Sequence, residues 1–286
     1  MGVVNVTPDS FSDGDRWFDH DAAVAHGLEL IAEGATVIDV GGESTRPFAH
    51  PVEPAEEQRR VLSVVRRLAP HVRVSIDTRH AETAVAAIEA GATLVNDVSA
   101  SLTRVAADAG VDWVAMHMLG DPTTMQLAPS YDDVVVEVRD FLVQRADEAV
   151  ALGVDEVWID PGFGFGKTLE HNLALVGHLD VLVATGYPVV VGLSRKGFLG
   201  RLLSVSDARA AAPPLPGLDP PLGDPEPVPA DDRLEASVAT AVWAMAQGAR
   251  MIRAHDVAAT VHAARLHGDC VTACSNAAAE ASWSAA

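Results

Sequence analysis

Basic residues are scarce in this chain of 286 amino acids. The 20 Lys and Arg residues stand against 40 Asp and Glu residues, which gives a formal net charge of −20 at pH 7. An acidic surface of this kind excludes broad binding of nucleic acids or anionic membranes, because both require a basic patch. A small anionic ligand remains compatible with the composition if the few positive charges are gathered in one place.

Cysteine and long apolar runs are also scarce. The two cysteines, Cys270 and Cys274, are too few for a disulfide framework or a four-cysteine zinc site, and we expect no metal there. No apolar run approaches the roughly 18 residues of a membrane-spanning helix. Met1 leads directly into a strand-like stretch instead of a secretion signal. We therefore expect a cytoplasmic protein without membrane or nucleic-acid partners.

Lysine and asparagine are rare, and their positions are informative. The chain has two lysines and four asparagines. A biased genome explains their rarity, but it does not explain why most of them lie in polar or glycine-rich segments that follow short β-branched runs. These residues are Lys167, Lys196, Asn5, Asn96 and Asn172.

A recurring pattern indicates the fold class. Six times a helical stretch ends in glycine, followed by a short apolar run and then a polar residue, as from Gly34 to Asp39. Glycine often ends helices because it adopts left-handed backbone easily. Short apolar runs are typical of parallel strands covered on both faces. With the runs at Val3–Asn5 and Val74–Asp77, the sequence predicts eight strands.

Helical segments separate these strands. We predict helices over His20–Glu33, Pro54–Leu68, Ala81–Ala90, Thr103–Ala109, Asp132–Leu152, Leu169–His178, Arg233–Gln247 and Asp256–His267. Eight β-then-α units predict an α/β fold, a (β/α)₈ TIM barrel in a single domain. A doubly wound open sheet is the alternative, but it usually has a glycine-rich turn after the first strand, which this sequence lacks.

The domain organisation is predicted from composition. One catalytic domain is expected over residues 1–267. Residues 207–232 contain eight prolines, and we expect a mobile, partly polyproline insertion there. Residues 268–286 are small and polar, and they are expected to form a flexible C-terminal tail.

Polar residues end the predicted strands. In a parallel barrel these ends meet at one mouth, where active sites lie. A single Asp or Asn there could cap a helix, but most of these residues precede their helix by several positions. We therefore interpret the set as a functional site. Its members are Asn5, Asp39, Asp77, Asn96, His117, Asp160, Lys196, Arg253 and His255.

The set divides into two chemical groups. Two carboxylates, an amide and an ammonium match the alternating donors and acceptors of a fused nitrogen heterocycle. These groups belong to Asp77, Asn96, Asp160 and Lys196. The oxygen of Asn5, with Arg253 and His255, suits a diphosphate with Mg²⁺. We expect a heterocycle at one end of the site and a charged leaving group at the other, with Arg253 and His255 contacting only the leaving group.

The glycine-rich run Pro161–Thr168 is similar to a phosphate-binding loop. It has Pro161 where that motif requires glycine, so we do not predict ATP binding. We interpret the run as a loop over the barrel mouth that closes with Phe163 and Phe165. Its Lys167 is expected to matter less than Lys196, because it follows the loop and does not end a strand.

Eight segments of the chain resemble the motifs of the dihydropteroate synthase family. They run in order through every predicted strand end, which makes the match more specific than any isolated motif. The segments are Asn5–Gly14, Gly41–Pro47, Ser75–Thr78, Asn96–Ser99, Met116–Pro122, Asp160–Lys167, Gly192–Lys196 and Ile252–Val257.

The resemblance implies a (β/α)₈ barrel, a homodimer and a transferase of folate biosynthesis. In that family, 4-aminobenzoate condenses with (7,8-dihydropterin-6-yl)methyl diphosphate to give 7,8-dihydropteroate and diphosphate. Breaking the methylene C–O bond leaves positive charge on carbon and negative charge on the diphosphate. Carboxylates can stabilise the former, and Mg²⁺ with cationic side chains the latter.

The resemblance also implies roles for individual residues. The pterin ring would contact Asp77, Asn96, Asp160 and Lys196. The diphosphate would contact Asn5, Thr45, Arg253 and His255, with Asn5 as a ligand of Mg²⁺. The 4-aminobenzoate would lie among Thr7, Pro8, Ser10, Phe11, Arg46, Pro47, Phe165 and Ser194. The catalytic set would be Asp77, Asp160, Lys196, Arg253 and His255.

Some positions depart from the family pattern. Gly197 follows Lys196 where many relatives carry Ser or Arg, Phe48 replaces a common Gly, and Ala254 lies between Arg253 and His255. None of these changes removes a residue assigned to the chemistry. Three alternative functions are a silent pterin-binding paralogue, a pterin-dependent methyltransferase and a non-enzymatic binding module. Diphosphate release that depends on 4-aminobenzoate separates the synthase from all three.

Overall fold

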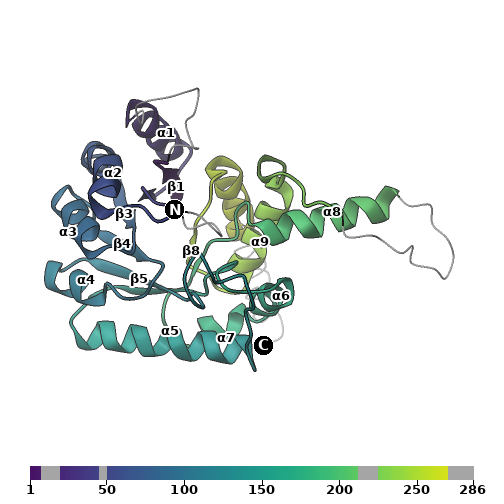
Figure 1. The fold of residues 1–286 in the computed structure, drawn as a ribbon. Helices are drawn as coiled ribbons and strands as arrows, with labels where there is room; N and C mark the ends of the chain where they lie inside the picture. The colour runs from purple at the N-terminus through teal and green to yellow at the C-terminus, as the bar shows by residue number, and fades with distance from the viewer. Residues whose placement is uncertain (8–19, 45–49, 212–224, 270–286) are drawn as a thin grey trace, which may run out of the picture.

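Strands and helices alternate along the chain in the computed structural model, which describes residues 1–7, 20–44, 50–211 and 225–269 (Figure 1). The strands are β1 (Gly2–Asn5), β2 (Val37–Gly41), β3 (Arg73–Asp77), β4 (Leu94–Asp97), β5 (Asp112–Met116), β6 (Val157–Asp160), β7 (Val190–Val191) and β8 (Met251–Ile252). All eight predicted strands are therefore confirmed.

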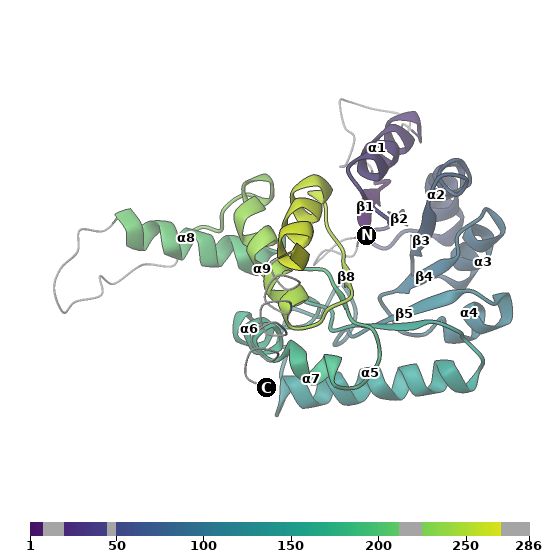
Figure 2. The same cartoon turned by 180° about the vertical axis from the view of Figure 1, so that it is seen from behind.

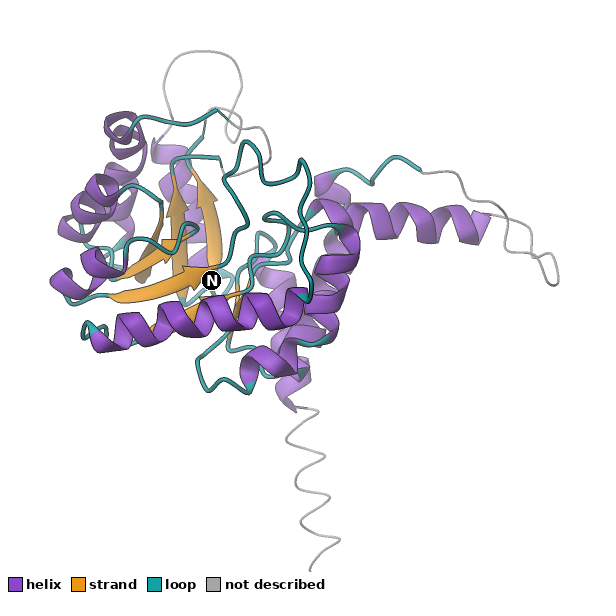
Figure 3. Cartoon of the chain, turned by 60° about the horizontal axis from the view of Figure 1, so that its bottom comes forward, coloured by secondary structure: helices purple, strands orange, loops and turns teal. Residues whose placement is uncertain are grey.

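The strands close into a parallel barrel. Strands β1 to β6 form one sheet in chain order, and β7 pairs with β8 in a second, two-stranded sheet. Two single bridges join these sheets, Ile159 to Val189 and Gly2 to Ala254. The predicted (β/α)₈ barrel is confirmed, and Figure 3 shows the strands surrounded by helices.

The helices cover the outside of the barrel. They are α1 (His20–Ala32), α2 (Pro54–Leu68), α3 (Ala81–Glu89), α4 (Thr103–Ala109), α5 (Val134–Ala151), α6 (Leu169–Gly177), α7 (Leu179–Val183), α8 (Gly197–Ala211) and α9 (Leu234–Ala246), with the 3₁₀ turn η1 (Ala230–Asp232) and a last helix over residues 257–269. In the described part of the chain, no helix is long and apolar enough to cross a membrane.

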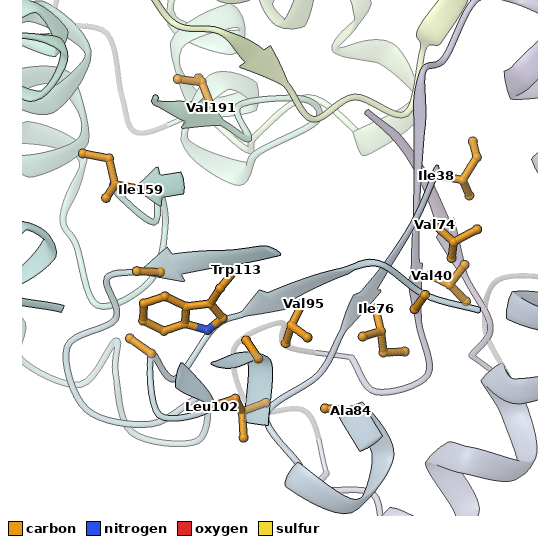
Figure 4. Packing of buried hydrophobic residues seen from close by; sticks show 14 of the residues in the cluster. Ile38, Val40, Val74, Ile76, Ala84, Val95, Leu102, Trp113, Ile159 and Val191 are labelled. Carbon is orange, nitrogen blue, oxygen red and sulfur yellow. The ribbon is translucent and has the colours of Figure 1, made fainter. Parts of the chain in front are cut away.

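Alternation along the strands creates two apolar layers. Outward residues such as Ile76 and Val95 pack against helix residues such as Ala84 of α3, as Figure 4 shows. Inward residues from five strands form a smaller cluster that fills the barrel floor. This floor layer consists of Val37, Leu94, Val114, Trp158 and Val190. Because the side-chain period is two, the residue two positions after a floor residue points into the barrel nearer its mouth.

Two helices were not predicted. The short helix α7 follows α6 directly, and α8 begins at Gly197, immediately after Lys196. Gly197 and Gly200 resemble helix breakers, but Gly200 is buried where an added Cβ would lie 2.4 Å from Arg233 Nε. Close contact with the η1 segment therefore explains a glycine inside this helix. Helix α8 projects away from the barrel (Figures 1 and 2).

Helix α8 also changes the limits of the predicted proline-rich insertion. Residues 207–211 belong to α8, so they are not irregular as the composition suggested, and Ala230–Asp232 form η1. Residues 225–229 have no regular secondary structure. The remaining residues of the insertion, 212–224, and the tail from residue 270 lie outside the described part of the chain, whereas residues 268 and 269 end the last helix.

Candidate functional site

The candidate site lies at the carboxyl ends of the strands, directly above the floor layer. Asp39, Asn96 and Asp160 each follow a floor residue by two positions, and Asp77 and Arg253 have the same inward orientation on β3 and after β8. Alternation of side chains therefore brings these polar groups together over an apolar base. The sequence predicted this convergence, and the structure confirms it.

Arg253 is the centre of a buried hydrogen-bond network. Its Nε donates to Asp39 Oδ2 at 2.6 Å, and its Nη2 donates to Asp77 Oδ2 at 2.8 Å. Asn96 Nδ2 donates to the same Asp39 oxygen at 3.0 Å. Asp39 is fully buried and the Arg253 side chain is 19% exposed, so Arg253 balances the Asp39 charge where water has limited access. The sequence placed Asp39 among the strand ends but assigned it no role.

This network differs from the predicted division of the site. Arg253 was expected to serve only the anionic end, but it forms an ion pair with Asp77, which was assigned to the heterocycle. The guanidinium is long and presents several N–H donors, so it can reach across the mouth to both carboxylates. The two ends of the site are therefore electrostatically coupled in the absence of ligand.

Asp160 and Lys196 lie on the opposite side of the mouth. Asp160 is 3% exposed, and its Oδ1 accepts a hydrogen bond from Gly162 N at 2.7 Å. Lys196 Nζ lies 4.3 Å from the centre of the Phe165 ring, within the range of a cation–π contact. A cavity of about 70 Å³ separates these groups, and Asp77, Asp160, Phe165, Lys196 and Arg253 line part of it.

Burial shifts the protonation of these groups. Burial, and next the charge of Asp39, raise the pKa of Asp77 to about 7, although Arg253 opposes the shift. Burial also raises the pKa of Asp160 above its usual range. The same effect lowers the pKa of Lys196 to about 8, against the attraction of Asp160. Charged groups with pKa values moved toward neutrality are typical of functional sites.

The segment after β7 is joined to the segment after β8. Ser194 Oγ accepts a hydrogen bond from His255 N and contacts His255 Nδ1, both at 3.1 Å. Arg195 has a left-handed backbone, with φ of 59°, and its side chain bonds to Asp256. Burial, followed by repulsion from Arg253, lowers the pKa of His255 to about 3. His255 is therefore neutral at physiological pH. The bonds between the two segments also hold Lys196 close to Arg253.

His117 and Lys167 lie behind the site. Lys167 is only 3% exposed, and its Nζ lies 2.9 Å from His117 Nδ1. His117 is buried against Phe141 and Tyr131 and does not line the cavity, although the sequence placed it with the strand ends. The rarity of lysine was the one feature of the sequence that drew attention to Lys167, and nothing in the sequence predicted its contact with His117.

Asn5 is the candidate metal ligand. It ends β1, and its side-chain oxygen lies near Gly41, on the same side as Asp77. No cluster of three or more His, Cys, Asp or Glu residues that could hold a metal ion occurs in the described ranges. A site here would therefore rely on few protein ligands.

Several predicted site residues lie outside the described part of the chain. They are Pro8, Ser10, Phe11, Thr45, Arg46 and Pro47. Thr7 is half-buried and lies two residues after β1, and Phe165 is half-buried above Lys196.

Comparisons with known proteins agree with the geometry. The sequence model of the family described as pterin binding enzyme matches residues 1–255. The chain is 46% identical to the dihydropteroate synthase of Mycobacterium leprae, covering 94% of this chain and 92% of that protein. It is 40% identical to the dihydropteroate synthase of Escherichia coli K12, covering 93% of this chain and 89% of that protein.

Solved structures are similar over the same length. The dihydropteroate synthase of Yersinia pestis, in complex with a sulfonamide drug, gives a TM-score of 0.82 at 39% identity, covering 95% of this chain and 94% of the other. The Xanthomonas albilineans dihydropteroate synthase with 4-aminobenzoic acid gives 0.81 at 43% identity, covering 96% and 92%. The likeness thus extends through every strand that contributes to the candidate site.

Proposed function

The chain belongs to the dihydropteroate synthase family of pterin-binding enzymes and is a transferase of folate biosynthesis, and we propose that its barrel mouth carries out the reaction as follows. The enzyme condenses 4-aminobenzoate with (7,8-dihydropterin-6-yl)methyl diphosphate and releases 7,8-dihydropteroate and diphosphate. The observation that best supports placing this reaction at the barrel mouth is one shared cavity, which is lined by Asp77, Asp160, Lys196 and Arg253.

The cavity groups suit a pterin ring. A carboxylate at Asp160 accepts from two N–H donors of an aminopyrimidinone edge, and Lys196 donates to ring nitrogen or oxygen acceptors. Asn96 bonds to Asp39 and is not among the residues that line the cavity, and its amide is proposed to contact the ring from the end of β4. A cavity of about 70 Å³ is smaller than typical ligand pockets. Phe165 and Lys196 both line this cavity, so they are the side chains next to the proposed ring position.

The diphosphate is proposed to lie beyond the pterin, near Arg253 and His255, with Thr45 as a further contact. If Ser194 Oγ donates to His255 Nδ1, the imidazole proton lies on Nε2, which can donate to a phosphate oxygen. Arg253 supplies a delocalised positive charge and several N–H donors, which match phosphate oxygens well.

The proposed metal is Mg²⁺, with Asn5 as its protein ligand. One neutral oxygen fits this ion, because Mg²⁺ retains several waters and often binds through substrate phosphates instead of a complete protein cage. When bound, Mg²⁺ would neutralise charge on the diphosphate. The position of Asn5 at the end of β1, beside the mouth, is compatible with this role.

The 4-aminobenzoate is proposed to bind at the outer edge of the mouth. Phe165 and Ser194 would contact it from the described part of the chain, together with Thr7. The remaining assigned contacts are Pro8, Ser10, Phe11, Arg46 and Pro47. A weakly nucleophilic aromatic amine depends on orientation and exclusion of water more than on a strong base.

The proposed mechanism is dissociative. The C–O bond between the pterin methylene and the diphosphate breaks, and its electron pair leaves with the diphosphate oxygen. Asp77 and Asp160 stabilise the resulting carbocation, while Arg253 and His255 stabilise the leaving group. The nitrogen of 4-aminobenzoate then forms the new C–N bond and loses a proton to water. The catalytic set is therefore Asp77, Asp160, Lys196, Arg253 and His255.

A direct assay tests this function. Purified protein with both substrates and Mg²⁺ should release diphosphate and form dihydropteroate in equal amounts. Omitting 4-aminobenzoate should abolish dihydropteroate formation. Pterin binding without turnover would contradict the synthase and favour a silent pterin-binding protein.

Removing the Lys196 ammonium should weaken pterin binding. We expect Lys196→Ala to lower the affinity for a dihydropterin about 10- to 100-fold, as for loss of one charged hydrogen bond. Calorimetry with 6-hydroxymethyl-7,8-dihydropterin measures this effect. Arg201→Ala on the exposed face of α8 is the matched control and should bind normally. An unchanged affinity of Lys196→Ala would remove Lys196 from the pterin site.

Pterin binding should depend on pH through Asp77 and Lys196. Lys196 is charged below its pKa of about 8, so affinity should fall as the pH rises through that value. Asp77 is charged above its pKa of about 7, so affinity should also fall as the pH decreases through that value. Calorimetric titration of 6-hydroxymethyl-7,8-dihydropterin across this range should give a bell-shaped profile. Arginine stays charged throughout this pH range, so Lys196→Arg should lose only the fall in affinity at alkaline pH. If that alkaline fall remained in Lys196→Arg, it could not be assigned to Lys196.

We further propose the assembly and organisation that the sequence suggested. The catalytic domain covers residues 1–267, the protein is a cytoplasmic homodimer, and the proline-rich segment is an accessory insertion. The acidic composition supports the expectation that its partners are small molecules and not nucleic acids or membranes.

A further inference from the structure

Lys167 is a buried cation that the proposed mechanism does not use. Its Nζ lies 2.9 Å from His117 Nδ1, and it donates to the carbonyls of Gly162 and Phe165 at 3.0 Å and of His117 at 3.3 Å. An ammonium has three N–H donors, so these four acceptors use all of its hydrogen-bonding capacity. Lys167 therefore joins the loop after β6 to the end of β5.

The loop of residues 162–166 is held along its whole length. Gln126 Nε2 donates to Gly164 O at 2.5 Å, and Tyr131 OH donates to Gly166 O at 2.8 Å. Asn172 Oδ1 accepts from Gly164 N at 2.7 Å. Lys167 supplies the bonds to the carbonyls of Gly162 and Phe165, so four of the five loop carbonyls accept a hydrogen bond from a side chain.

The loop also packs closely against backbone. An added Cβ at Gly162 would lie 1.9 Å from His117 O, and one at Gly166 would lie 2.6 Å from Leu119 O. Both glycines have positive φ, at 66° and 62°. The loop can therefore occupy its place only while His117 and the residues after it stay in position, and Lys167 bonds to both sides of this contact.

Burying the charged side chain of Lys167 costs free energy, which other interactions in the folded protein must offset. Burial lowers its pKa to about 7, although the charge of Asp160 opposes this shift. Burial lowers the pKa of His117 to about 3, so His117 is neutral and can accept a hydrogen bond at Nδ1. A buried ammonium whose partners are only neutral oxygen and nitrogen atoms costs more free energy than an apolar side chain that fills the same space. What the ammonium adds over an apolar side chain is the set of hydrogen bonds that fix the loop.

We propose that Lys167, together with His117, is a positioning residue that fixes the loop of residues 162–166 so that Phe165 is correctly placed for 4-aminobenzoate. This inference rests on the proposed function, because it uses the assignment of Phe165 to that substrate. The pterin ligands Asn96, Asp160 and Lys196 belong to strand ends and to the segment after β7. Asp160 and Lys196 contact the loop only through Gly162 N and the Phe165 ring, so pterin binding should be affected less than 4-aminobenzoate binding when Lys167 is changed.

Lys167→Met tests the proposal, because methionine keeps a similar length and removes the N–H donors. We expect the KM for 4-aminobenzoate to rise about 10- to 100-fold, since small misplacements of a positioning element have effects of this size. The Kd for 6-hydroxymethyl-7,8-dihydropterin should change at least about tenfold less than this KM, because Asp160 is fixed at the end of β6 and contacts the loop through one backbone bond. An unchanged KM, or an equal loss for both ligands, would overturn the proposal.

Hydrogen exchange provides a readout that does not depend on activity. In the unliganded protein, the amides of Gly164 and Phe165 are hydrogen-bonded and should be protected. Lys167→Met should increase their exchange at least about tenfold, as expected for local opening. Arg73→Met is the matched control, because it removes a cation that binds Asp112 and Glu156 at the start of the strands, away from the mouth. It should leave exchange in this loop unchanged.

His117 variants keep the proposal testable if Lys167→Met does not fold. Asparagine can place an acceptor near the position of Nδ1, whereas leucine cannot. His117→Asn should therefore retain loop protection and a nearly normal KM, and His117→Leu should lose both. Equal behaviour of the two variants would overturn the proposal. A wild-type protein with a protected loop but no synthase activity would instead contradict the proposed function alone.

Discussion

Replacing Arg253 with alanine is expected to lower kcat/KM about 1000-fold, because one donor to the developing charge is lost from a site that excludes water. The substitution also leaves Asp39 and Asp77 without their shared partner. Removing one member of a buried ion pair costs about 3–5 kcal/mol of stability. Arg253→Ala should therefore show both a lower unfolding temperature and a severe loss of turnover.

Because Arg253 forms an ion pair with Asp77, we expect Arg253→Ala to weaken the binding of pterin ligands both with and without diphosphate. Binding of the diphosphate ester should fall strongly in Arg253→Ala, but binding of 6-hydroxymethyl-7,8-dihydropterin should fall as well, because the pKa of Asp77 rises without the guanidinium. His255→Ala should weaken only the diphosphate ester, since His255 contacts Ser194 and not the buried carboxylates.

Arg73→Ala serves as the control for stability, because it removes a half-buried ion pair far from the mouth. Calorimetry with both ligands, together with thermal unfolding, separates these effects. Normal binding of the diphosphate ester by Arg253→Ala would show that Arg253 is a structural partner of Asp39 and Asp77 only.

Asp160→Ala should cause the largest loss of pterin affinity. Its carboxylate can accept two hydrogen bonds from one edge of the ring, and losing two charge-assisted bonds corresponds to about 100- to 1000-fold in Kd. Because Asp160 is 3% exposed, water cannot easily replace the missing carboxylate. The loss should be similar for dihydropterin ligands with and without diphosphate, in contrast to His255→Ala.

Asp97→Asn is the matched control for Asp160→Ala. Asp97 is also a fully buried carboxylate near the end of a strand, but it accepts from Ser99, Leu102 N and Trp113 Nε1 and does not face the mouth. It should lower stability and leave the pterin Kd unchanged. Equal Kd values for Asp160→Ala and the wild-type protein would show that the ring binds elsewhere.

The strands were predictable from the sequence because their signals are local. The apolar runs are bounded by glycines with positive φ, such as Gly34 and Gly91 at 108° and 115°, and by polar ends. Helix α8 was missed because Gly197 and Gly200 disfavour a helix locally, and the reason for Gly200 is its close contact with Arg233, more than 30 residues later.

The convergence of the site residues was predictable for a related reason. Parallel strands place their carboxyl ends at one mouth. The partners of each residue were not predictable, because they depend on distances across the closed barrel. Arg253 and Asp39 are 214 residues apart in the chain, and Lys167 and His117 are 50 residues apart. Their burial and pairing become visible only when the strands are arranged in space.

The division of the barrel into two sheets has a thermodynamic consequence. Asp77, Asn96 and Asp160 belong to the six-stranded sheet, whereas Lys196 and Arg253 follow the strands of the two-stranded sheet. Single bridges and a few backbone hydrogen bonds join the sheets at each seam, and the bonds from Arg253 to Asp39 and Asp77 add side-chain contacts between the two sheets. A ligand that touches both Asp160 and Lys196 adds a further connection across a seam. The free energy of binding then also stabilises the association of the two sheets. Saturation with ligand therefore stabilises the folded barrel against unfolding by mass action.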